Sequence, residues 1–492
     1  MALFGNQSIP RGTVFDRRGL PLATGDPAVA KRASDAYKKA GVEIPGCVVS
    51  GFSRTGNVVS GFTRTSADER CYPLGGAAFH LLGDVRDARN WAATNTAYVE
   101  RDSQDHLRGF DDHATTVKLP DASGHLVQTM RRDFSELVPL LRHRYSPNHA
   151  DVKAFLHRTR DVRLTIDAPL QAAVARILAT YAERSATGHA AAVVINPDTG
   201  ELLAVGSYPF PTVAADSRHR NDAEESETLI DRARFGLYPP GSTFKLVTAT
   251  AALRQSQAFR DSTFICSLQP NGRIGAQVAG TLVRDDVLDE HPHGRIDMHE
   301  GLVHSCNAYF AQLAVSVGPA PLLDTANLLG ISVARDDSVA RLRATLPQAG
   351  YGQGDVVASP LRMARVAAAI ASGGILRDTT VEKIATGRAV TTHVLMSPDA
   401  ATTLGRYMRD SVLTGTGRRL REHPSRIAGK TGTAEVHGAQ SHAWFVGYAP
   451  YGPAEKRVAF AVLIENAGYG GAAAAPAAGE IVAAAAANGL VK

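Results

Sequence analysis

The chain has 492 residues, of which 44% are hydrophobic and 21% are charged, so it has the composition of a globular protein and the length for two or more domains. Its formal net charge of +5 is not gathered into a basic run, which argues against nucleic acid as a partner. Four cysteines, at positions 47, 71, 266 and 306, are too few for a disulfide framework in so long a chain. A bridge between Cys47 and Cys71 stays open, and Cys306 is expected to be a small packed residue.

Residues 1 to 160 are expected to form a separate, extended module. The segment Val48–Thr55 recurs ten residues later as Val58–Thr65, with Thr63 in the place of Ser53. Because ten is even, two extended copies would present corresponding side chains on the same face. A pair of strands or a chance duplication is favoured over a ribbon that binds a peptide or a partner protein.

From about Asp161 the apolar residues follow helical and strand periods in turn, which predicts an α/β (α+β) fold with helices packed on a sheet. The predicted elements are a helix over 171–181, strands over 190–195 and 202–206 joined by a turn at 196–200, strands over 443–448 and 458–464 that flank the strand of Lys430, and a closing helix over 472–487.

Ser242 and Lys245 are spaced to act as a nucleophile and its base. They lie three residues apart, and on a helix this spacing places two side chains on one face. A serine hydroxyl needs a base within hydrogen-bond reach, and a lysine acts as that base when burial or nearby positive charge lowers its pKa. Pro239, Pro240 and Gly241 favour a sharp entry into the helix, whose first N–H groups and positive dipole end suit a developing oxyanion.

Two further motifs follow in order, namely Ser305-Cys306-Asn307 and Lys430-Thr431-Gly432-Thr433. Ser305 could relay a proton towards a leaving amine, and the Asn307 amide can both donate and accept hydrogen bonds to a peptide. Lys430 is expected to supply the positive charge that lowers the pKa of Lys245. On a strand, Lys430 and the threonine hydroxyls could hold a carboxylate, and Gly432 would let a substrate backbone approach closely. The ordered set predicts an acyl-transfer site.

These motifs resemble those of the monofunctional, class B penicillin-binding proteins, which carry Ser-x-x-Lys, Ser-x-Asn and Lys-Thr-Gly in this order. The longer segment Tyr238–Lys245 matches the family's Tyr-x-Pro-Gly-Ser-Thr-Phe-Lys pattern, and weaker matches lie at 11–19, 164–167, 352–354, 359–361 and 444–448. The resemblance implies the five-stranded transpeptidase fold, shared with serine β-lactamases, over 161–492. It implies a non-catalytic pedestal or dimerisation module over 1–160.

The resemblance also implies a D,D-transpeptidase that cross-links peptidoglycan stem peptides. Ser242, deprotonated by Lys245, would attack the penultimate D-Ala, and Ser305 would protonate the leaving D-Ala. The substrate-binding residues would be Asn307, Lys430, Thr431, Gly432 and Thr433, with the backbone N–H groups of Ser242 and Thr433 as oxyanion hole. The expected partners are stem peptides, β-lactam antibiotics that acylate Ser242, and a glycan polymerase of the wall-synthesis machinery. No cofactor is expected.

Two other functions stay open. A serine β-lactamase shares the acylation residues, but the glutamates between Asn307 and Lys430, Glu382 and Glu422, are not in the Glu-x-x-x-Asn pattern of one lactamase group. A penicillin sensor or wall-assembly scaffold would acylate without transfer. Rapid turnover of β-lactam would indicate the lactamase, and a stable acyl complex without transfer would indicate the sensor.

Two weaker motifs predict local structure without a bound ligand. Histidines and a glutamate cluster at His291, His293, His299, Glu300 and His304, but their spacing shows no ordered ligand set, so a polar loop without metal is expected. Gly350, Gly352 and Gly354 lack the strand and acidic residue of a dinucleotide site and are expected to form a turn.

The family acts at the outer face of the cytoplasmic membrane, in the periplasm or at the cell exterior, and is usually anchored there. No run of 18 apolar residues is visible in this sequence. We therefore expect a chain whose anchor was removed or is supplied from elsewhere.

Overall fold

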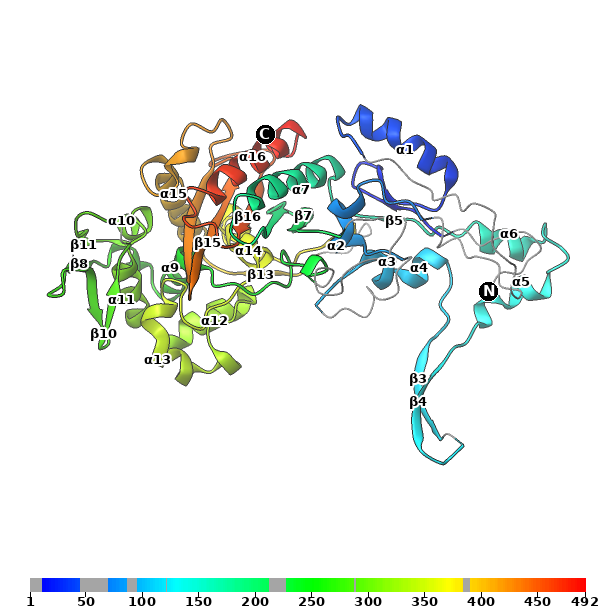
Figure 1. The fold of residues 1–492 in the computed structure, drawn as a ribbon, viewed down its shortest axis with the longest axis horizontal. Helices are drawn as coiled ribbons and strands as arrows, with labels where there is room; N and C mark the ends of the chain where they lie inside the picture. The colour runs from blue at the N-terminus through cyan, green and yellow to red at the C-terminus, as the bar shows by residue number, and fades with distance from the viewer. Residues whose placement is uncertain are drawn as a thin grey trace. The chain divides into compact units, whose positions relative to one another are not determined.

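The computed structural model describes residues 11–44, 70–85, 95–120, 122–211, 227–286, 289–383 and 390–492 (Figure 1). Two compact units divide the chain, the first comprising Met1–Leu164 with Pro211–Arg220 and the second Thr165–Phe210 with Asn221–Lys492. The repeat at 48–65 and Cys47 lie outside the described residues. The assignment of a non-catalytic role to residues 1–160 stays a prediction.

The first unit contains mostly short elements and a buried charged network. Its elements are β1 Val14–Phe15, β2 Pro21–Ala23, α1 Pro27–Lys39, η2 Gly75–Ala78, α2 Phe79–Leu82, α3 Val99–Asp102, α4 Gln104–Arg108, β3 Thr115–Pro120, β4 Leu126–Arg131, η4 Ser135–Leu137, α5 Val138–Arg142, α6 Ala150–Leu156 and β5 Val162–Arg163. Strand β1 pairs with both β2 and β5, and β3 pairs with β4 as a hairpin. Cys71 is disulfide-bonded.

The buried network of this unit consists of Glu100 between Arg11 and Arg70. The Arg11 Nη2 lies 2.6 Å from Glu100 Oε2, and the Arg70 Nε lies 2.7 Å from Oε1. The carboxylate side chain is fully buried. Two charge-assisted contacts to one buried carboxylate offset the cost of removing it from water.

The second unit is built on one large sheet. Its elements are α7 Ala168–Ala182, β6 Ala190–Ile195, β7 Leu202–Tyr208, η5 Gly241–Phe244, α9 Lys245–Gln255, η6 Gln257–Asp261, β8 Phe264–Leu268, β9 Ile274–Val278, β10 Thr281–Arg284, β11 Gly294–Ile296, α10 Met298–Val303, α11 Asn307–Val317, α12 Pro319–Leu329, η7 Arg335–Asp337, α13 Val339–Ala349, α14 Pro360–Ala371, β12 Ile375–Arg377, β13 Thr392–Val394, α15 Pro398–Leu413, η8 Arg418–Leu420, β14 Ala428–Val436, β15 Ala439–Ala449, β16 Val458–Ile464 and α16 Ala474–Ala487.

The large sheet is antiparallel with the strand order β14-β15-β16-β6-β7. Its strands and the helices α7 and α16 confirm the elements predicted between 171 and 206 and between 443 and 487. One expectation was wrong, because β16 pairs with β15 and β6 and does not flank the strand of Lys430. Strand β14 is therefore at the sheet edge and has a single strand neighbour, β15.

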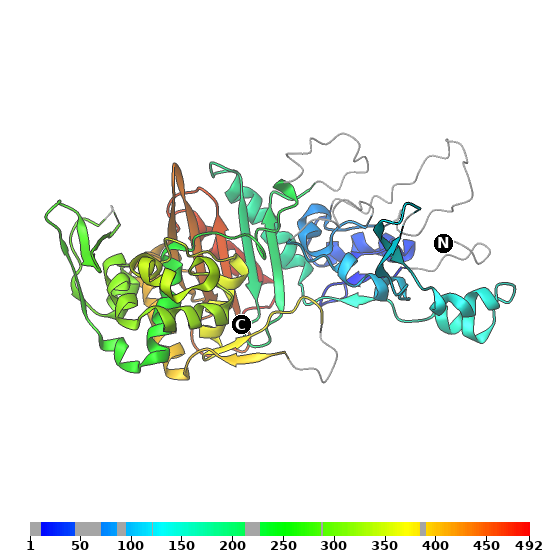
Figure 2. The ribbon, with the colours of Figure 1, turned by 90° about the horizontal axis from the view of Figure 1, so that it is seen from below.

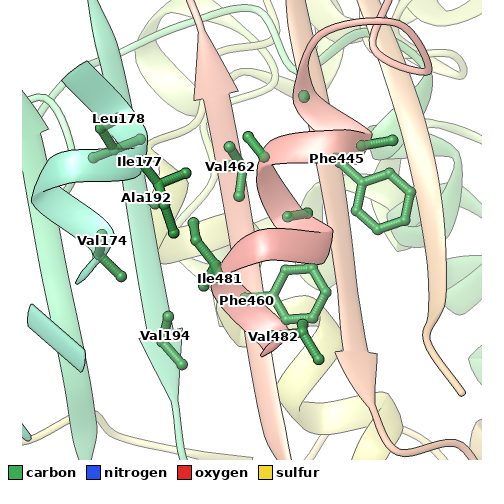
Figure 3. Packing of buried hydrophobic residues seen from close by; sticks show 14 of the residues in the cluster. Val174, Ile177, Leu178, Ala192, Val194, Phe445, Phe460, Val462, Ile481 and Val482 are labelled. Carbon is green, nitrogen blue, oxygen red and sulfur yellow. The ribbon is translucent and has the colours of Figure 1, made fainter. Parts of the chain in front are cut away.

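The core on one face of this sheet follows the two-residue period of its strands. Ala190, Ala192 and Val194 of β6 pack with α7 and α16, and so do Phe460, Val462 and Ile464 of β16. Figure 3 shows Ile177 and Leu178 of α7 and Ile481 and Val482 of α16 among these strand residues. Helix α14 packs on β16, β6 and β15, and its residues do not belong to this cluster. The sheet is therefore covered by helices on both faces, whereas the sequence predicted helices packed on a sheet without saying on which face.

The chain between η5 and α13 forms a largely helical part of the second unit. Helix α9 packs against α11 and α12, and η5 packs against β14. Figures 1 and 2 show this segment, coloured green to yellow-green, beside the orange strands. A small sheet with the order β10-β9-β8-β11 precedes α10. Among the described residues, none of the helices has both the length and the apolar character needed to cross a bilayer.

Candidate active site

Ser242 lies in the 3-10 turn η5, and helix α9 begins at Lys245. The predicted helical run after Lys245 is confirmed, whereas the serine itself precedes the α-helix in a tighter turn. Gly241 has a φ of +52°, and a Cβ there would lie 2.6 Å from the Thr433 carbonyl oxygen. The serine turn therefore needs a glycine for its backbone conformation and for its close approach to β14.

The segment around Gly352 supports the serine turn from the other side. The Gly241 N–H donates to the Gly352 carbonyl at 3.0 Å. Gly352 has a φ of +81°, and a Cβ on it would lie 2.1 Å from the Gly241 carbonyl oxygen. The prediction of a turn at 350–354 is confirmed. This turn contacts the serine turn at Gly241, the residue before Ser242.

Lys245 is fully buried and connects the first motif to the second. Its Nζ donates to Asn307 Oδ1 at 2.7 Å, to Ser305 Oγ at 3.2 Å and to the Ser305 carbonyl oxygen. Burial lowers the pKa of Lys245 to about 8, although the nearby carboxylates of Asp285 and Asp286 act in the opposite direction. A lysine with such a pKa has a substantial neutral fraction near neutral pH, as a general base requires.

Lys430 of the third motif contacts the same Ser305 hydroxyl as Lys245. It is fully buried on β14, and its Nζ donates to Ser305 Oγ at 2.7 Å and to the Thr431 carbonyl at 3.1 Å. Burial and the charge of Lys245 lower the pKa of Lys430 well below its usual range. Burial is the leading cause of the lowered pKa of Lys245, and the effect of one lysine on the other is found at Lys430, whose pKa is lowered by the charge of Lys245.

Ser305 lies in a strained turn between two helices. Helix α10 ends at Val303, Ser305 has a φ of +63°, and Cys306 caps α11 by accepting from the Tyr309 N–H. A left-handed conformation is unfavourable for a residue with a Cβ and persists when its surroundings hold it there. The turn aims the hydroxyl and the carbonyl of Ser305 at the two lysines.

Strand β14 carries the four residues of the third motif. Thr431 and Thr433 lie on one side of the pleat, where Thr431 Oγ1 lies 2.5 Å from Thr416 Oγ1 and Thr433 Oγ1 accepts from the Gly470 N–H at 3.4 Å. Thr416 is a hydroxyl next to the site that sequence reasoning missed.

Gly432 has a structural role that differs from the one expected. A Cβ at this position would lie 2.8 Å from Thr243 Cγ2 and 2.9 Å from the Pro240 carbonyl oxygen. The missing side chain therefore allows the serine turn to pack on β14. The close approach of a substrate backbone was the reason given from the sequence, and it stays a prediction.

Two further residues hold the serine turn and were not assigned from the sequence. The Trp444 indole N–H on β15 donates to the Pro239 carbonyl at 3.0 Å. The Tyr238 hydroxyl donates to Glu465 Oε1 at 2.6 Å. Tyr238 and Trp444 lie in segments that resemble the family, but the partners of both side chains are remote in the sequence.

The histidine cluster has a different structure from the expected polar loop. Strand β11 and helix α10 occupy part of this segment, and the His299 Nε2 lies 3.0 Å from Asp410 Oδ2. Within the described part of the chain, His293 is the one member of this cluster that belongs to a group of close ligand atoms, together with Cys266, Asp285 and Cys306. Cys306 is buried, as expected, and is a free thiol.

Comparison with known proteins identifies the family of this chain. The family model described as "Penicillin binding protein transpeptidase domain" matches residues 190–483, more than half of the chain. The chain belongs to the penicillin-binding protein transpeptidase family. This membership confirms the transpeptidase fold, and together with the relatives PbpA and MrdA it confirms the class B resemblance.

Relatives of this penicillin-binding protein include named enzymes of wall synthesis. The peptidoglycan D,D-transpeptidase PbpA of Mycobacterium tuberculosis is 31% identical over 337 residues, which cover 58% of this chain and 65% of PbpA. The chain thus matches less than two thirds of the length of PbpA. The peptidoglycan D,D-transpeptidase MrdA of Escherichia coli K12 is 24% identical over 514 residues, which cover 90% of this chain and 72% of MrdA.

The fold of this penicillin-binding protein is also found in a solved structure. The penicillin G acyl-enzyme complex of penicillin-binding protein A from Mycobacterium tuberculosis has a TM-score of 0.62 at 23% identity, and the match covers 97% of this chain and all of that one. At this identity the match shows a shared fold.

Proposed function

We propose that this protein is a D,D-transpeptidase that cross-links peptidoglycan stem peptides through an acyl-enzyme on Ser242. The observation that carries the proposal is the meeting of three separate motifs at Ser305, which receives hydrogen bonds from both Lys245 and Lys430. The names of PbpA and MrdA support the same activity.

Acylation begins with proton transfer from Ser242 to Lys245. The neutral amine of Lys245 takes the proton, and Ser242 Oγ forms a bond to the carbonyl carbon of the penultimate D-Ala. The bond to the terminal D-Ala nitrogen then breaks, and that nitrogen takes a proton through Ser305. Ser305 recovers a proton from the lysine ammonium that donates to it, so no proton is lost. An amine from a second stem peptide reverses these steps and forms the cross-link.

The edge position of β14 provides a docking surface for an extended peptide. An edge strand has backbone groups that a further strand can pair with. Thr431 and Thr433 present hydroxyls from this strand, and Lys430 adds a positive charge when protonated. We infer that these residues hold the terminal carboxylate, that Asn307 orients the donor amide, and that the N–H groups of Ser242 and Thr433 bind the oxyanion.

The partners and location belong to this proposal. β-Lactams acylate Ser242 as mimics of the donor, a reading supported by the acyl-enzyme described for the structural relative. The enzyme works at the outer face of the cytoplasmic membrane with a glycan polymerase that supplies uncross-linked strands. Both statements rest on the family resemblance.

The test measures the fate of the acyl group with a donor pentapeptide and an added amine. We expect release of D-Ala, formation of the amide with the amine, and loss of both in Ser242→Ala. Ser256→Ala is the matched control, because Ser256 lies at the far end of α9 and caps η6. This control should behave as the wild type. Rapid hydrolysis of penicillin would instead support a lactamase, and a stable acyl complex without transfer would support a sensor.

A further inference from the structure

A basic segment on the surface of the second unit follows helix α15. Four of the nine residues from Arg418 to Arg426 are arginines, and Glu422 is the one acidic residue among them. All four arginines are exposed. Basic charge is therefore more concentrated here than was expected from the sequence. Residues 418–426 are called the arginine platform below.

The backbone of the arginine platform is fixed on the interior of the unit. Leu420 is buried in the core cluster that includes α16, and His423 Nε2 lies 3.1 Å from the carbonyl oxygen of Gly479 in that helix. The N–H groups of Arg421, His423 and Arg426 each donate to the carbonyl three residues earlier. A surface with a fixed backbone loses less conformational freedom when it binds a partner.

Most of the positive charge on the platform has no acidic partner. Arg421 lies 3.3 Å from Glu422, and because both side chains are exposed this ion pair is weak. Among the residues that the structure describes, none forms an ion pair with Arg418, Arg419 or Arg426. These three guanidinium groups therefore attract anions over a Debye length of about 8 Å at physiological salt.

The platform begins beside the third motif of the candidate active site. Thr416 Oγ1 lies 2.5 Å from Thr431 Oγ1, and the Gly417 N–H donates to the Ser411 carbonyl of α15 at 3.0 Å. Arg418 is two residues after Thr416, and two residues span at most about 7 Å. The platform therefore adjoins the part of β14 that holds the terminal carboxylate in the proposed function.

We propose that the arginine platform binds carboxylates of an uncross-linked peptidoglycan strand while one stem peptide of that strand occupies the site of Ser242. This inference rests on the proposed function, in which every donor stem peptide ends in a carboxylate, so that the strand is a polyanion. Arginine suits this ligand because its planar guanidinium can form two parallel hydrogen bonds to one carboxylate.

The platform gives the enzyme a preference for donors on a polymer. A strand held at the platform keeps its other stem peptides near Ser242, which raises their effective concentration without any new contact at the serine. A single soluble pentapeptide has one terminal carboxylate, which the third motif already holds. The platform therefore lowers the KM of the strand and has little effect on the KM of the soluble peptide.

The first test compares these two donors in a variant with reversed charge. In the double variant Arg418→Glu with Arg419→Glu, the KM for uncross-linked strands should rise about tenfold and kcat should stay the same. The KM for the soluble pentapeptide and the rate of acylation by a fluorescent penicillin should change less than about threefold. Arg341→Glu with Arg343→Glu is the matched control, because it makes the same change of charge at exposed positions of α13 and should keep the KM of the wild type for both donors.

The second test uses wild-type protein and does not depend on the folding of a variant. An increase in salt from about 0.1 M to 1 M shortens the Debye length from about 10 Å to 3 Å, so it should raise the KM for strands about tenfold and that for the pentapeptide much less. Cosedimentation of strands with Ser242→Ala measures binding without catalysis. Reversal of charge at positions 418 and 419 in that protein should abolish the cosedimentation.

Three results would overturn the inference. They are an unchanged KM for strands in the platform variant, a KM for strands that does not depend on salt, and binding of phosphatidylglycerol vesicles that needs the platform while the KM for strands does not. The last result would assign the platform to a lipid surface. Transfer from neither donor would contradict the proposed function, whereas transfer from the pentapeptide with any of these three results would contradict the role of the platform alone.

Discussion

Lys245 and Lys430 are both fully buried, and both donate to Ser305 Oγ. Protonation of both lysines at once is unfavourable at such a site, because burial and mutual repulsion disfavour the second positive charge. The structure therefore favours a state with at least one neutral lysine. The base that Ser242 requires is available when Lys245 is itself neutral, and its pKa of about 8 allows this for a fraction of the molecules near neutral pH.

The pH dependence of acylation tests this point at Lys245, whose pKa is lowered to about 8. Burial is the largest effect and lowers this pKa, whereas four nearby groups raise it, namely Asp285, Cys306, Asp286 and Asp289. Lys430 lies against the same Ser305 hydroxyl as Lys245. Because the neutral amine is the active form, acylation should accelerate as pH rises and level off above about pH 8. Between pH 6 and pH 8 the rate should rise about 50-fold.

The measurement is the single-turnover rate of acylation by a fluorescent penicillin across this range. Lys245→Arg keeps the positive charge and loses the base at every pH, so it should remove most of the rate and the dependence on pH. A rate for the wild type that stays flat from pH 6 to pH 9 would rule out Lys245 as the titrating base.

At the scale of elements, the site depends on close contacts between a turn and its neighbours. The serine turn η5 packs on β14 through Gly241 and Gly432 and on the 350–354 turn through Gly352. Each contact brings two backbones together at a distance that a Cβ would prevent. The positions of Ser242 and Thr433 relative to one another follow from these contacts.

Gly352→Ala should displace the serine turn, whereas Gly354→Ala should not. Both glycines have positive φ, +81° and +75°, so each alanine costs about 1–2 kcal/mol in backbone strain. Only the Cβ at position 352 meets the backbone, at 2.1 Å from the Gly241 oxygen, while the nearest atom at position 354 is 3.5 Å away. A displacement of about 1 Å slows such chemistry about 100-fold.

Acylation kinetics and chemical denaturation of the two variants provide the measurement. The expected result is a large loss of acylation rate for Gly352→Ala beyond the shared loss of stability. Equal acylation rates in the two variants would contradict the role given to this contact.

The sequence predicted the active-site residues better than it predicted their support. Ser242 and Lys245 could be paired because their spacing is local, and Ser305 and Lys430 because their motifs follow in order. Cys266 and Asp285 lie beside Cys306 in the structure but 40 and 21 residues before it in the sequence. Because the three residues belong to separate elements, no spacing pattern groups them. The edge position of β14 was also missed, since period-two patterns do not reveal which strands are neighbours.

At the scale of the whole molecule, each unit has its own buried interior. The first contains the network of Arg11, Arg70 and Glu100, and the second contains the sheet core around Phe460. Stability and catalysis can therefore be perturbed separately.

Glu100→Gln should destabilise the first unit by about 3–5 kcal/mol, because it leaves two arginines without their buried partner. Asp102→Asn removes an exposed contact to Arg101 and should cost about 1 kcal/mol or less. Calorimetry should show a lower melting transition for Glu100→Gln alone, with acylation unchanged below that transition. A loss of stability as small as that of Asp102→Asn would contradict the importance of the network.

The most direct test of the central claim is the intact mass of the protein after reaction with benzylpenicillin, followed by peptide mapping. We predict one adduct per chain, on the peptide that contains Ser242, and no adduct on Ser242→Ala. An adduct that persists in Ser242→Ala, or that maps to another serine, would contradict the assignment of Ser242 as the nucleophile.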